Sequence, residues 1–442
     1  MESTFALILA LLLVGIMSLA ILARPYLGLI VIVATQPVID LLPGIPYVDS
    51  VLPLIGAATV GAFLINANRG SVKGAFRFNL THLLAGMLIA WMLVTHPQAA
   101  WAGKDRNWFL TYLQLWFLLW LAGVLMDSPA KYRQLMWVFA LTTLASAVSV
   151  INRQGGFTSE IDPLVRASGL TQGANTAARY FTVTFVFLFY LRTVSRNFFI
   201  GLGATLGMIV AFLGVFYTVS RTGMLLLAIA LVMLFFQQSK FKYRLQITAI
   251  TGAALLVLLV FSGSIFAFIG EIAPSIEAGS DTVGLRYALW DAGVQMWQDH
   301  PISGVGIGEY KFELKNYPNR RYAFLFNKGL VAHNMYISML AETGAMGFLL
   351  FIALLGKCLL DLWNAGRIKD PQFKALRHVW LIVLVVMALG GLTKTDQVDK
   401  LLWLTMGVSV FFNNLVKMER RKAVGKPKEY PTPQALMEKT TS

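Results

Sequence analysis

Long runs of apolar residues, repeated along almost the whole chain, constrain the fold more than any other feature of the sequence. A helix that spans a membrane needs about 20 mostly apolar residues. The runs that meet or approach this length lie at residues 5–22, 27–42, 51–66, 80–95, 108–126, 133–151, 178–191, 198–218, 222–237, 246–270, 335–357, 378–393 and 401–415. We therefore predict an all-α polytopic membrane protein with 12 to 13 transmembrane helices. Two short runs that contain or adjoin prolines, 27–42 and 51–66, leave room for one re-entrant segment.

The composition agrees with this prediction. Of the 442 residues, 57% are hydrophobic and only 13% are charged, whereas soluble proteins carry roughly 25% charged residues. The first basic residue, Arg24, follows the first apolar run, so we interpret that run as a membrane helix and not as a cleaved signal peptide. The single cysteine, Cys358, excludes an intrachain disulfide and a cysteine metal site.

The net charge of +15 is explained by short basic loops, so we expect no nucleic-acid partner. Basic residues gather at Arg69–Arg77, Lys131–Arg133, Arg192–Arg196, Lys240–Arg244 and Arg367–Arg377, and in the tail from Lys417. When the helices between them are counted, all these clusters fall on one face, which the positive-inside rule assigns to the cytoplasm. We predict one transmembrane domain over residues 1–418 and a polar, disordered cytoplasmic tail over 419–442.

The opposite face receives residues 96–107, 152–177, 271–334 and 394–400. Segment 271–334 is the longest, and its seven acidic and six basic residues nearly balance. A connection of this length is usually functional or disordered, and its many aromatic residues argue for packing. Leu285, Leu289, Gly293 and Trp297 recur at near-helical spacing, which predicts an amphipathic helix with Asp281 as its N-cap. We expect a large, partly helical loop.

Arg221 lies between two apolar runs, in the sequence Ser220-Arg221-Thr222-Gly223. An arginine at a membrane boundary is costly without a partner. Two interpretations remain open, a side chain that snorkels to the surface and a ligand for an anionic lipid headgroup. The second gains weight because Arg221 stands on the face that is poor in basic residues. A guanidinium also offers paired hydrogen bonds to phosphate.

Two more candidates belong to segment 271–334. Arg286 follows Gly284 near the predicted start of the amphipathic helix, where it is either a solvated charge or an anion ligand. His333 closes the segment just before an apolar run, and Asn334 is placed to cap the following helix. His333 is either structural or a general base, since histidine accepts a proton near neutral pH.

Polar residues also gather at residues 166–180, where Arg166, Asn175 and Arg179 precede or begin an apolar run. They mark either a capped helix start or a substrate contact. The alternating glycines Gly304, Gly306 and Gly308 do not form a nucleotide-binding fingerprint. They predict a bend in the backbone.

Signatures of metal chemistry are weak. The outer-face segments contain no DxD-type carboxylate pair for a divalent ion, and no HExxH or Ser/His/Asp signature occurs. Asp40 and Asp49 are the only outer-face acids near the first helices. They are the residues on which a metal-dependent glycosyltransferase would have to rely.

Together these motifs resemble the O-antigen ligase and O-antigen polymerase family. The resemblance rests on SRTG at the start of a helix, on HPISGVGIGEYKF in the large loop, and on HNMYISMLAETGAMGFLLF after it. GLTQGANTAARY is similar to that family's asparagine-containing outer segment. The resemblance spans roughly residues 160–357, and its most specific part is the His-Asn element followed by Glu342, Gly344 and Gly347. The first 150 residues are similar in hydropathy only.

The resemblance implies a GT-C-like membrane enzyme of the bacterial inner membrane, with its site at the periplasmic face. It implies inverting glycan transfer from undecaprenyl diphosphate to an acceptor hydroxyl, with no metal or other cofactor. His333 would be the catalytic base, and Arg221 and Arg286 would bind the diphosphate. Arg166, Asn175, Asn334 and Ser220 would be further substrate contacts. Fixed guanidinium groups suit the charge that develops on a diphosphate leaving group.

The acceptor remains open at this point. Lipid A-core would make the protein a ligase, which we favour, and a lipid-linked glycan would make it an O-antigen or exopolysaccharide polymerase. A protein hydroxyl is a third form of the same chemistry. A lipid-linked sugar flippase is the alternative of another class, but a transporter would place ionisable residues near the middle of the membrane. Here the charged candidates gather at one face.

Overall fold

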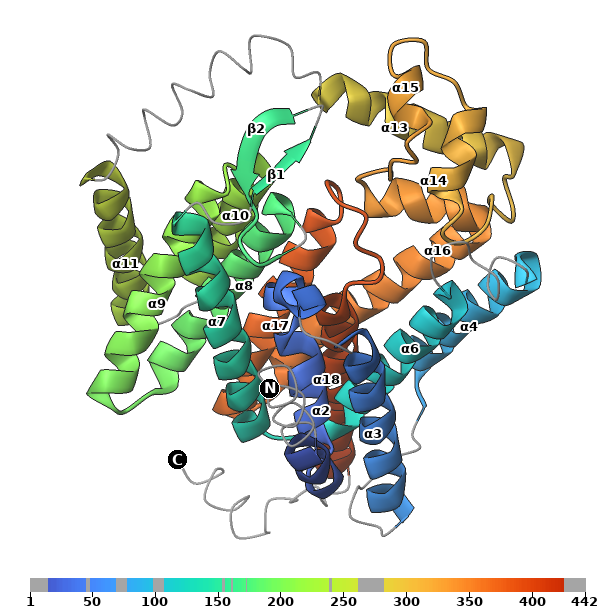
Figure 1. Cartoon of the computed structure of the whole chain (residues 1–442). Helices are drawn as coiled ribbons and strands as arrows, with labels where there is room; N and C mark the ends of the chain where they lie inside the picture. The colour runs from blue at the N-terminus through green and yellow to red at the C-terminus, as the bar shows by residue number, and fades with distance from the viewer. Residues whose placement is uncertain are drawn as a thin grey trace, which may run out of the picture.

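The computed structural model describes residues 15–44, 48–68, 78–97, 107–152, 156–159, 162–171, 173–237, 241–260 and 282–424. The longer helices are α2 (Tyr26–Ala34), α3 (Val48–Asn68), α4 (Leu80–Thr95), α6 (Trp108–Leu125), α7 (Pro129–Ile151), α8 (Ala174–Val194), α9 (Phe198–Tyr217), α10 (Arg221–Gln237), α11 (Phe241–Val260), α13 (Thr282–Asp299), α16 (Met335–Asn364), α17 (Pro371–Gly390) and α18 (Lys400–Val424). Short helical turns are η1 (Gln36–Gly44), α14 (Tyr310–Glu313), η2 (Leu314–Asn316), α15 (Ala323–Phe326) and η3 (Ala365–Arg367). Figure 1 shows a helical bundle with α13, α14 and α15 gathered at one end.

The chain is a multi-pass helical membrane protein, as its sequence predicts. Within the described residues, six helices are long and apolar enough to cross a membrane, namely α6, α7, α9, α16 with η3, α17 and α18. Three shorter apolar helices lie at Leu52–Asn68, Leu80–Thr95 and Arg221–Gln237. The predicted 12 to 13 also counted these shorter runs, the runs within α8 and α11, and the runs at 27–42 and 5–22, of which residues 5–14 lie outside the described residues.

The N-terminal run at 27–42 does not form one spanning helix. Helix α2 has 9 residues, about 14 Å of helix, which is less than half of a bilayer core of about 30 Å. A 3-10 turn, η1, follows, and Val38 inside it leaves the helical region. This run is therefore irregular, and the re-entrant path that the sequence left open for one of the two runs stays a prediction.

One small hairpin departs from an all-helical architecture. Strands β1 (Gly156–Ser159) and β2 (Asp162–Ala167) pair antiparallel, with Phe157 opposite Arg166. The hairpin lies at the same end of the bundle as α13 (Figure 1). We call this end, defined by residues 156–167 and 282–334, the loop face.

Basic residues mark the other end of the bundle. Lys131 and Arg133 lie in the first turns of α7, whose last turn leads towards the hairpin. Arg192 lies in the last turn of α8, and Arg421 and Lys422 lie in the last turn of α18. Helix α18 continues to Val424, so the first residues of the predicted disordered tail are helical, while residues 425–442 lie outside the described residues.

Helix α8 forms the centre of the bundle. Every residue from Thr176 to Leu191 is buried, the pattern of a helix enclosed on all sides. Helices α6 and α18 approach each other closely because of two glycines. A Cβ added at Gly407 would lie 2.2 Å from the carbonyl oxygen of Leu119, and one at Gly123 would lie 3.0 Å from Val410. Small residues at such crossings are typical of membrane helix packing.

Candidate functional site at the loop face

The amphipathic helix predicted in the large loop is α13. Leu285 and Leu289 are buried, and a Cβ at Gly293 would lie 2.5 Å from Ile337. The predicted amphipathic helix is confirmed, and it packs on the first turn of α16. Trp290 fixes it further, because its indole Nε1 donates a 3.0 Å hydrogen bond to the carbonyl of Ala332. The predicted cap, Asp281, lies outside the described residues.

His333 stands in the turn that Trp290 holds. Asn334 caps α16, since its Oδ1 accepts hydrogen bonds from the backbone N–H groups of Tyr336 at 2.9 Å and Ile337 at 3.2 Å. This confirms the predicted N-cap. The next residue, Met335, donates its N–H to the carbonyl of Gly391 at 2.7 Å. The turn is thus fixed to α13 on one side and to the end of α17 on the other.

The backbone of His333 is left-handed, with φ of +48°. Val219, with φ of +52°, is the other non-glycine residue of the described chain in this region. For a β-branched valine this conformation is a strong outlier. His333 lies two residues before α16, and Val219 lies two residues before α10. Backbone strain of this kind concentrates at functional sites, so it points to the same two helix starts that the sequence singles out.

The imidazole of His333 is surrounded by charge. Burial lowers the pKa of His333 to about 4, the nearby cations Arg286 and Lys394 lower it further, and Asp396 opposes them. The ring is therefore neutral at pH 7 and free to accept a proton. The structure brings Arg286 and His333 together, as the proposed diphosphate site requires, although 47 positions separate them in the sequence.

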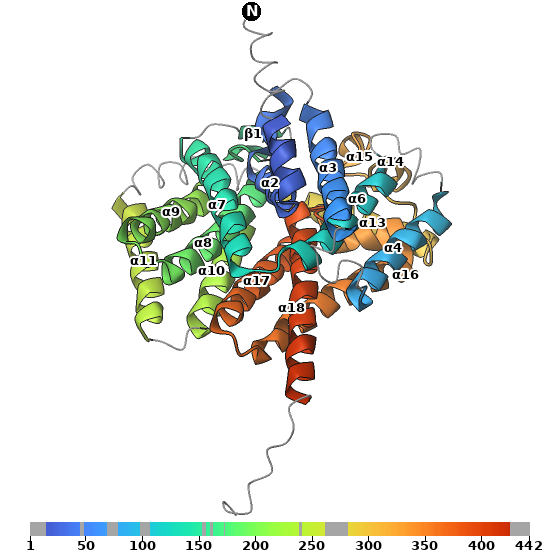
Figure 2. The ribbon, with the colours of Figure 1, turned by 90° about the horizontal axis from the view of Figure 1, so that it is seen from below.

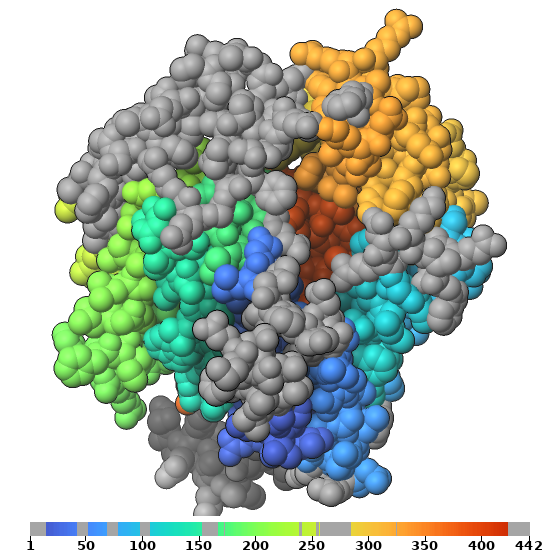
Figure 3. Space-filling view, in the orientation of Figure 1, coloured from blue at the N-terminus to red at the C-terminus, as the bar shows by residue number. Residues whose placement is uncertain are grey.

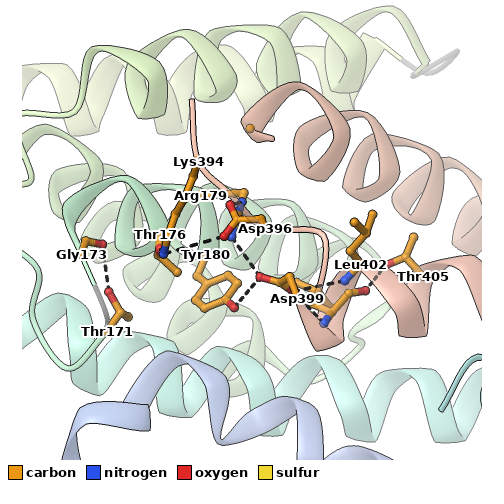
Figure 4. A network of polar contacts seen from close by, with 12 residues as sticks. Thr171, Gly173, Thr176, Arg179, Tyr180, Lys394, Asp396, Asp399, Leu402 and Thr405 are labelled. Atoms are coloured by element: carbon orange, nitrogen blue, oxygen red, sulfur yellow. Dashed lines mark hydrogen bonds and ion pairs between the residues drawn. The ribbon is translucent and has the colours of Figure 1, made fainter. Parts of the chain in front are cut away.

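The segment between α17 and α18 supplies residues that sequence reasoning missed. The ammonium of Lys394 contacts the hydroxyl of Thr176 and lies 3.8 Å from a carboxylate oxygen of Asp396. Arg179 pairs with Asp396, and its Nη2 donates a 2.9 Å hydrogen bond to Asp399 (Figure 4). A signal existed in the sequence, because KTDQVDK places four charges in a short connection between two apolar runs.

This network joins α8 to the start of α18. The hydroxyl of Tyr180 donates to Asp399 Oδ2 at 2.8 Å (Figure 4), while Asp399 Oδ1 accepts from the backbone N–H of Leu401 at 2.8 Å. Asp399 is thereby both ion-pair partner and N-cap. Arg179 is 1% exposed in its side chain, and a buried guanidinium is tolerated only when it is paired. The network therefore fixes the connection that carries Lys394 and Asp396, whose charges act on His333.

The Ser220-Arg221 element sits beside this network. Ser220 Oγ donates to Asn175 Oδ1 at 2.8 Å and accepts from the backbone N–H of Gly223 at 3.0 Å. Asn175 directly precedes Thr176, which contacts Lys394. Ser220 and Asn175, both predicted as substrate contacts, thus bind each other in this structure. Gly223 allows it, because a Cβ there would lie 2.3 Å from Ala178.

Arg221 itself is exposed at the first position of α10. Within the described residues it forms no ion pair or hydrogen bond, so its guanidinium is available to a ligand at the loop face. Arg286, on the other hand, is half-buried beside His333. The two predicted phosphate ligands therefore belong to different elements, α10 and α13, and His333 adjoins the second.

For the remaining predicted residues the structure describes fewer side-chain contacts. Arg166 lies in strand β2, and its side chain is outside the described residues. Asp40 lies in η1, where partial burial raises the pKa of its carboxyl group and the nearby Lys394 opposes this effect. Asp49 lies in the first turn of α3, and its side chain is also outside the described residues. No three His, Cys, Asp or Glu residues in the described part of the chain are grouped to hold a metal ion.

The glycines of GVGIG form a bend, as predicted. Gly304, Gly306 and Gly308 all have positive φ. The bend wraps a break in α16 at Gly344, where φ is +65° and a Cβ would lie 2.1 Å from the carbonyl oxygen of Ile302. The N–H of Gly306 donates to the carbonyl of Glu342 at 3.0 Å. This contact explains why the loop glycines and the Glu342–Gly344 element occur together.

Comparison with known proteins adds the decisive observation. Residues 206–352 match the family described as O-antigen ligase. This third of the chain is similar to the O-antigen ligase family. No curated protein matches the chain. The O-antigen ligase match contains Arg221, Arg286 and His333, and it ends before the Lys394–Asp399 segment, which completes the site from outside the matched region.

Proposed function

We propose that the protein transfers a glycan from undecaprenyl diphosphate to an acceptor hydroxyl, at the periplasmic face of the bacterial inner membrane. The observation that supports this best is His333, in a turn fixed between α13 and the end of α17, where burial and then the nearby cations Arg286 and Lys394 lower its pKa and favour the neutral imidazole. A base next to fixed positive charge suits a reaction in which a hydroxyl loses a proton while a diphosphate departs.

In the proposed step the acceptor oxygen attacks the anomeric carbon of the donor from the side opposite the diphosphate. The new carbon–oxygen bond forms as the bond to the diphosphate oxygen breaks, which inverts the anomeric centre. The acceptor proton passes to the imidazole of His333. Arg286 and Arg221, with Lys394 nearby, stabilise the negative charge on the leaving diphosphate, the task that a divalent cation performs in other phosphate-releasing enzymes.

The backbone of His333 suggests the variant that tests this role. Asparagine tolerates positive φ better than other residues besides glycine, so His333→Asn removes the base and keeps the turn. With purified protein in nanodiscs and a lipid-linked glycan donor, we expect transfer to fall by about 10²–10⁴-fold with unchanged donor binding. Transfer within twofold of the parent would contradict the assignment of His333 as the base.

The alternative of another class, a lipid-linked sugar flippase, predicts a different result. A flippase moves its lipid across the bilayer without a chemical step. The donor would then stay covalently unchanged with the parent protein and with His333→Asn alike. The buried ion pairs of the described chain lie near helix ends, Arg179–Asp396 at the start of α8 and Lys357–Asp361 at the end of α16. This placement favours chemistry at a surface over passage through the bilayer.

A further inference from the structure

An apolar groove of about 680 Å³ lies on the flank of the bundle between α3 and α6, with α2 behind it. Leu52, Gly56 and Gly61 line it from α3, and Leu110, Gln114 and Phe117 line it from α6. Its volume falls in the range of about 300–1,000 Å³ that is typical of sites for small molecules. Neither the family match nor the proposed chemistry uses this part of the chain.

The groove opens to the surface of the membrane-spanning region. Leu64 and Leu110 line it and remain 46% and 47% exposed, so the apolar interior is continuous with the side of the bundle that faces lipid. A chain that lies in the bilayer can therefore enter sideways. Gly56, Ala57 and Gly61 belong to the α3 wall beside larger residues, and a Cβ at either glycine would meet nothing within 4 Å, which leaves space for a methyl-branched chain.

The loop-face end of the groove is polar. Val398 and Lys400 close it there, and Gln114 exposes its amide in α6, about 9 Å along the helix from Trp108. Within the described residues Gln114 has no hydrogen-bond partner, which is costly at membrane depth. An ammonium group and a free amide at one end of an apolar groove are complementary to a lipid with a phosphate headgroup.

This end of the groove is joined directly to the candidate site. Lys400 follows Asp399, which pairs with Arg179 and Tyr180, and the same connection carries Lys394 against His333. Figure 3 shows the start of α18 recessed between residues 282–334 and the N-terminal helices. A headgroup held at Lys400 is therefore delivered to the connection that carries Lys394.

Arg221 begins a helix that lies on another flank of the bundle. Helix α10 packs on α8 and α17, and both Figure 1 and Figure 2 separate it from α3 and α6. The loop-face site thus has two membrane flanks, one with Arg221 and one with the groove. A transferase that joins two lipid-anchored molecules needs such an arrangement, because both substrates must reach one base while their chains stay in the bilayer.

We propose that the groove between α3 and α6 binds the polyprenyl chain of the acceptor, itself a polyprenyl-diphosphate-linked glycan. The inference rests on the proposed function and specifies its acceptor. The acceptor's sugar hydroxyl gains the glycan and loses its proton to His333, while its own diphosphate stays bonded. The donor's diphosphate leaves. The reaction is then chain extension on a lipid carrier, which favours the polymerase form over the ligase form.

The glycines of the groove provide the test. A Cβ at Gly56 or Gly61 would meet nothing within 4 Å, so Gly56→Leu and Gly61→Leu fill the groove without a clash in the bundle. Gly203 on α9 is exposed and equally open but lies outside the groove, so Gly203→Leu is the matched control. The probe is a photoreactive polyprenyl diphosphate in nanodiscs of phosphatidylethanolamine and phosphatidylglycerol.

In the parent protein and in Gly203→Leu we expect the probe to label peptides of α3 and α6. Labelling there should fall about tenfold in the two groove variants, a loss that corresponds to about 1.4 kcal/mol. Parent-like labelling in the groove variants, or absence of label from α3 and α6 in the parent, would overturn the proposal. Equal displacement of the probe by added phosphatidylglycerol would overturn the choice of a polyprenyl chain.

A transfer assay on the same variants separates the groove from the proposed function. We expect the groove variants to raise the KM for a polyprenyl-linked acceptor about tenfold and to leave the KM for the donor unchanged. If the parent transfers glycan and the groove variants keep its acceptor KM, the groove proposal fails and the function stands. If the parent labels at α3 and α6 but transfers nothing, the function fails and the acceptor role of the groove fails with it.

Discussion

Arg179 on α8 donates a 2.9 Å hydrogen bond to Asp399 at the start of α18, 220 positions later in the sequence, so a buried ion pair joins these two helices. Asp396, three residues before Asp399, pairs with the same guanidinium. The pair fixes the connection that holds Lys394 beside His333. Stability and the geometry of the site therefore depend on the same arginine.

Replacing Arg179 with methionine should destabilise the protein strongly. The change leaves Asp396 and Asp399 buried without their cation, and breaking such a pair costs about 3–5 kcal/mol. We expect a large fall in the melting temperature in detergent. The matched control is Lys131→Met, because Lys131 pairs with Asp127 at 2.8 Å on the exposed surface, where a pair contributes about 0–1 kcal/mol. Similar melting temperatures for both variants would contradict the structural role of Arg179.

Arg221→Lys should impair glycan transfer although the charge is kept. An ammonium group cannot form the two parallel hydrogen bonds that a guanidinium forms with phosphate, and loss of one transition-state donor costs about 10²–10³-fold in kcat. Because Arg221 is exposed, we expect no change in melting temperature. Arg192→Lys, at the basic end of α8, serves as control and should transfer at the parent rate. Parent-like transfer by Arg221→Lys would exclude a bidentate phosphate contact.

Apolar runs predict most of the helices, because a membrane helix is specified by its own residues. Local sequence patterns predicted three features of the site correctly, namely the N-cap Asn334, the amphipathic face of α13 and the glycine bend at 304–308. The partners of His333 were harder to find. Lys394 and Asp396 reach it only after α16 and α17 have folded back, and no local pattern encodes that return. The break at Gly344 was also missed, since its residues continue an apolar run.

The pH dependence of transfer should follow His333. Its pKa of about 4 lies below the ordinary value of about 6.5, so the free enzyme keeps a neutral base down to mildly acidic pH. We expect kcat/KM, which reports the free enzyme, to stay level between about pH 5.5 and 7.5 and to fall below about pH 5. A bound diphosphate should raise the pKa, so the acid limb of kcat should lie at higher pH. An acid limb of kcat/KM near pH 6.5 would contradict a buried base beside two cations.

The same shift predicts how stability changes with pH. Between about pH 4 and 6.5 the unfolded chain binds a proton at His333 that the folded chain does not. Stability from this group therefore rises with pH through that window and is lost as pH falls through it. Comparison of melting temperatures at pH 4.5 and 7 should show a smaller difference for His333→Asn than for the parent. An equal difference in both proteins would mean that His333 is not the group that titrates.

Two glycines of α16 should respond to alanine in opposite directions. At Gly344, φ of +65° and a contact of 2.1 Å with Ile302 leave no room for a Cβ, and strain with overpacking costs about 2–5 kcal/mol in total. At Gly356 on the same helix nothing lies within 4 Å, so alanine should stabilise the helix by about 0.5–1 kcal/mol. Melting temperatures should thus fall for Gly344→Ala and rise slightly for Gly356→Ala. Because the break at Gly344 fits the GVGIG bend to α16, Gly344→Ala should also reduce transfer, whereas Gly356→Ala should not. A stable, fully active Gly344→Ala protein would show that α16 runs unbroken past this position.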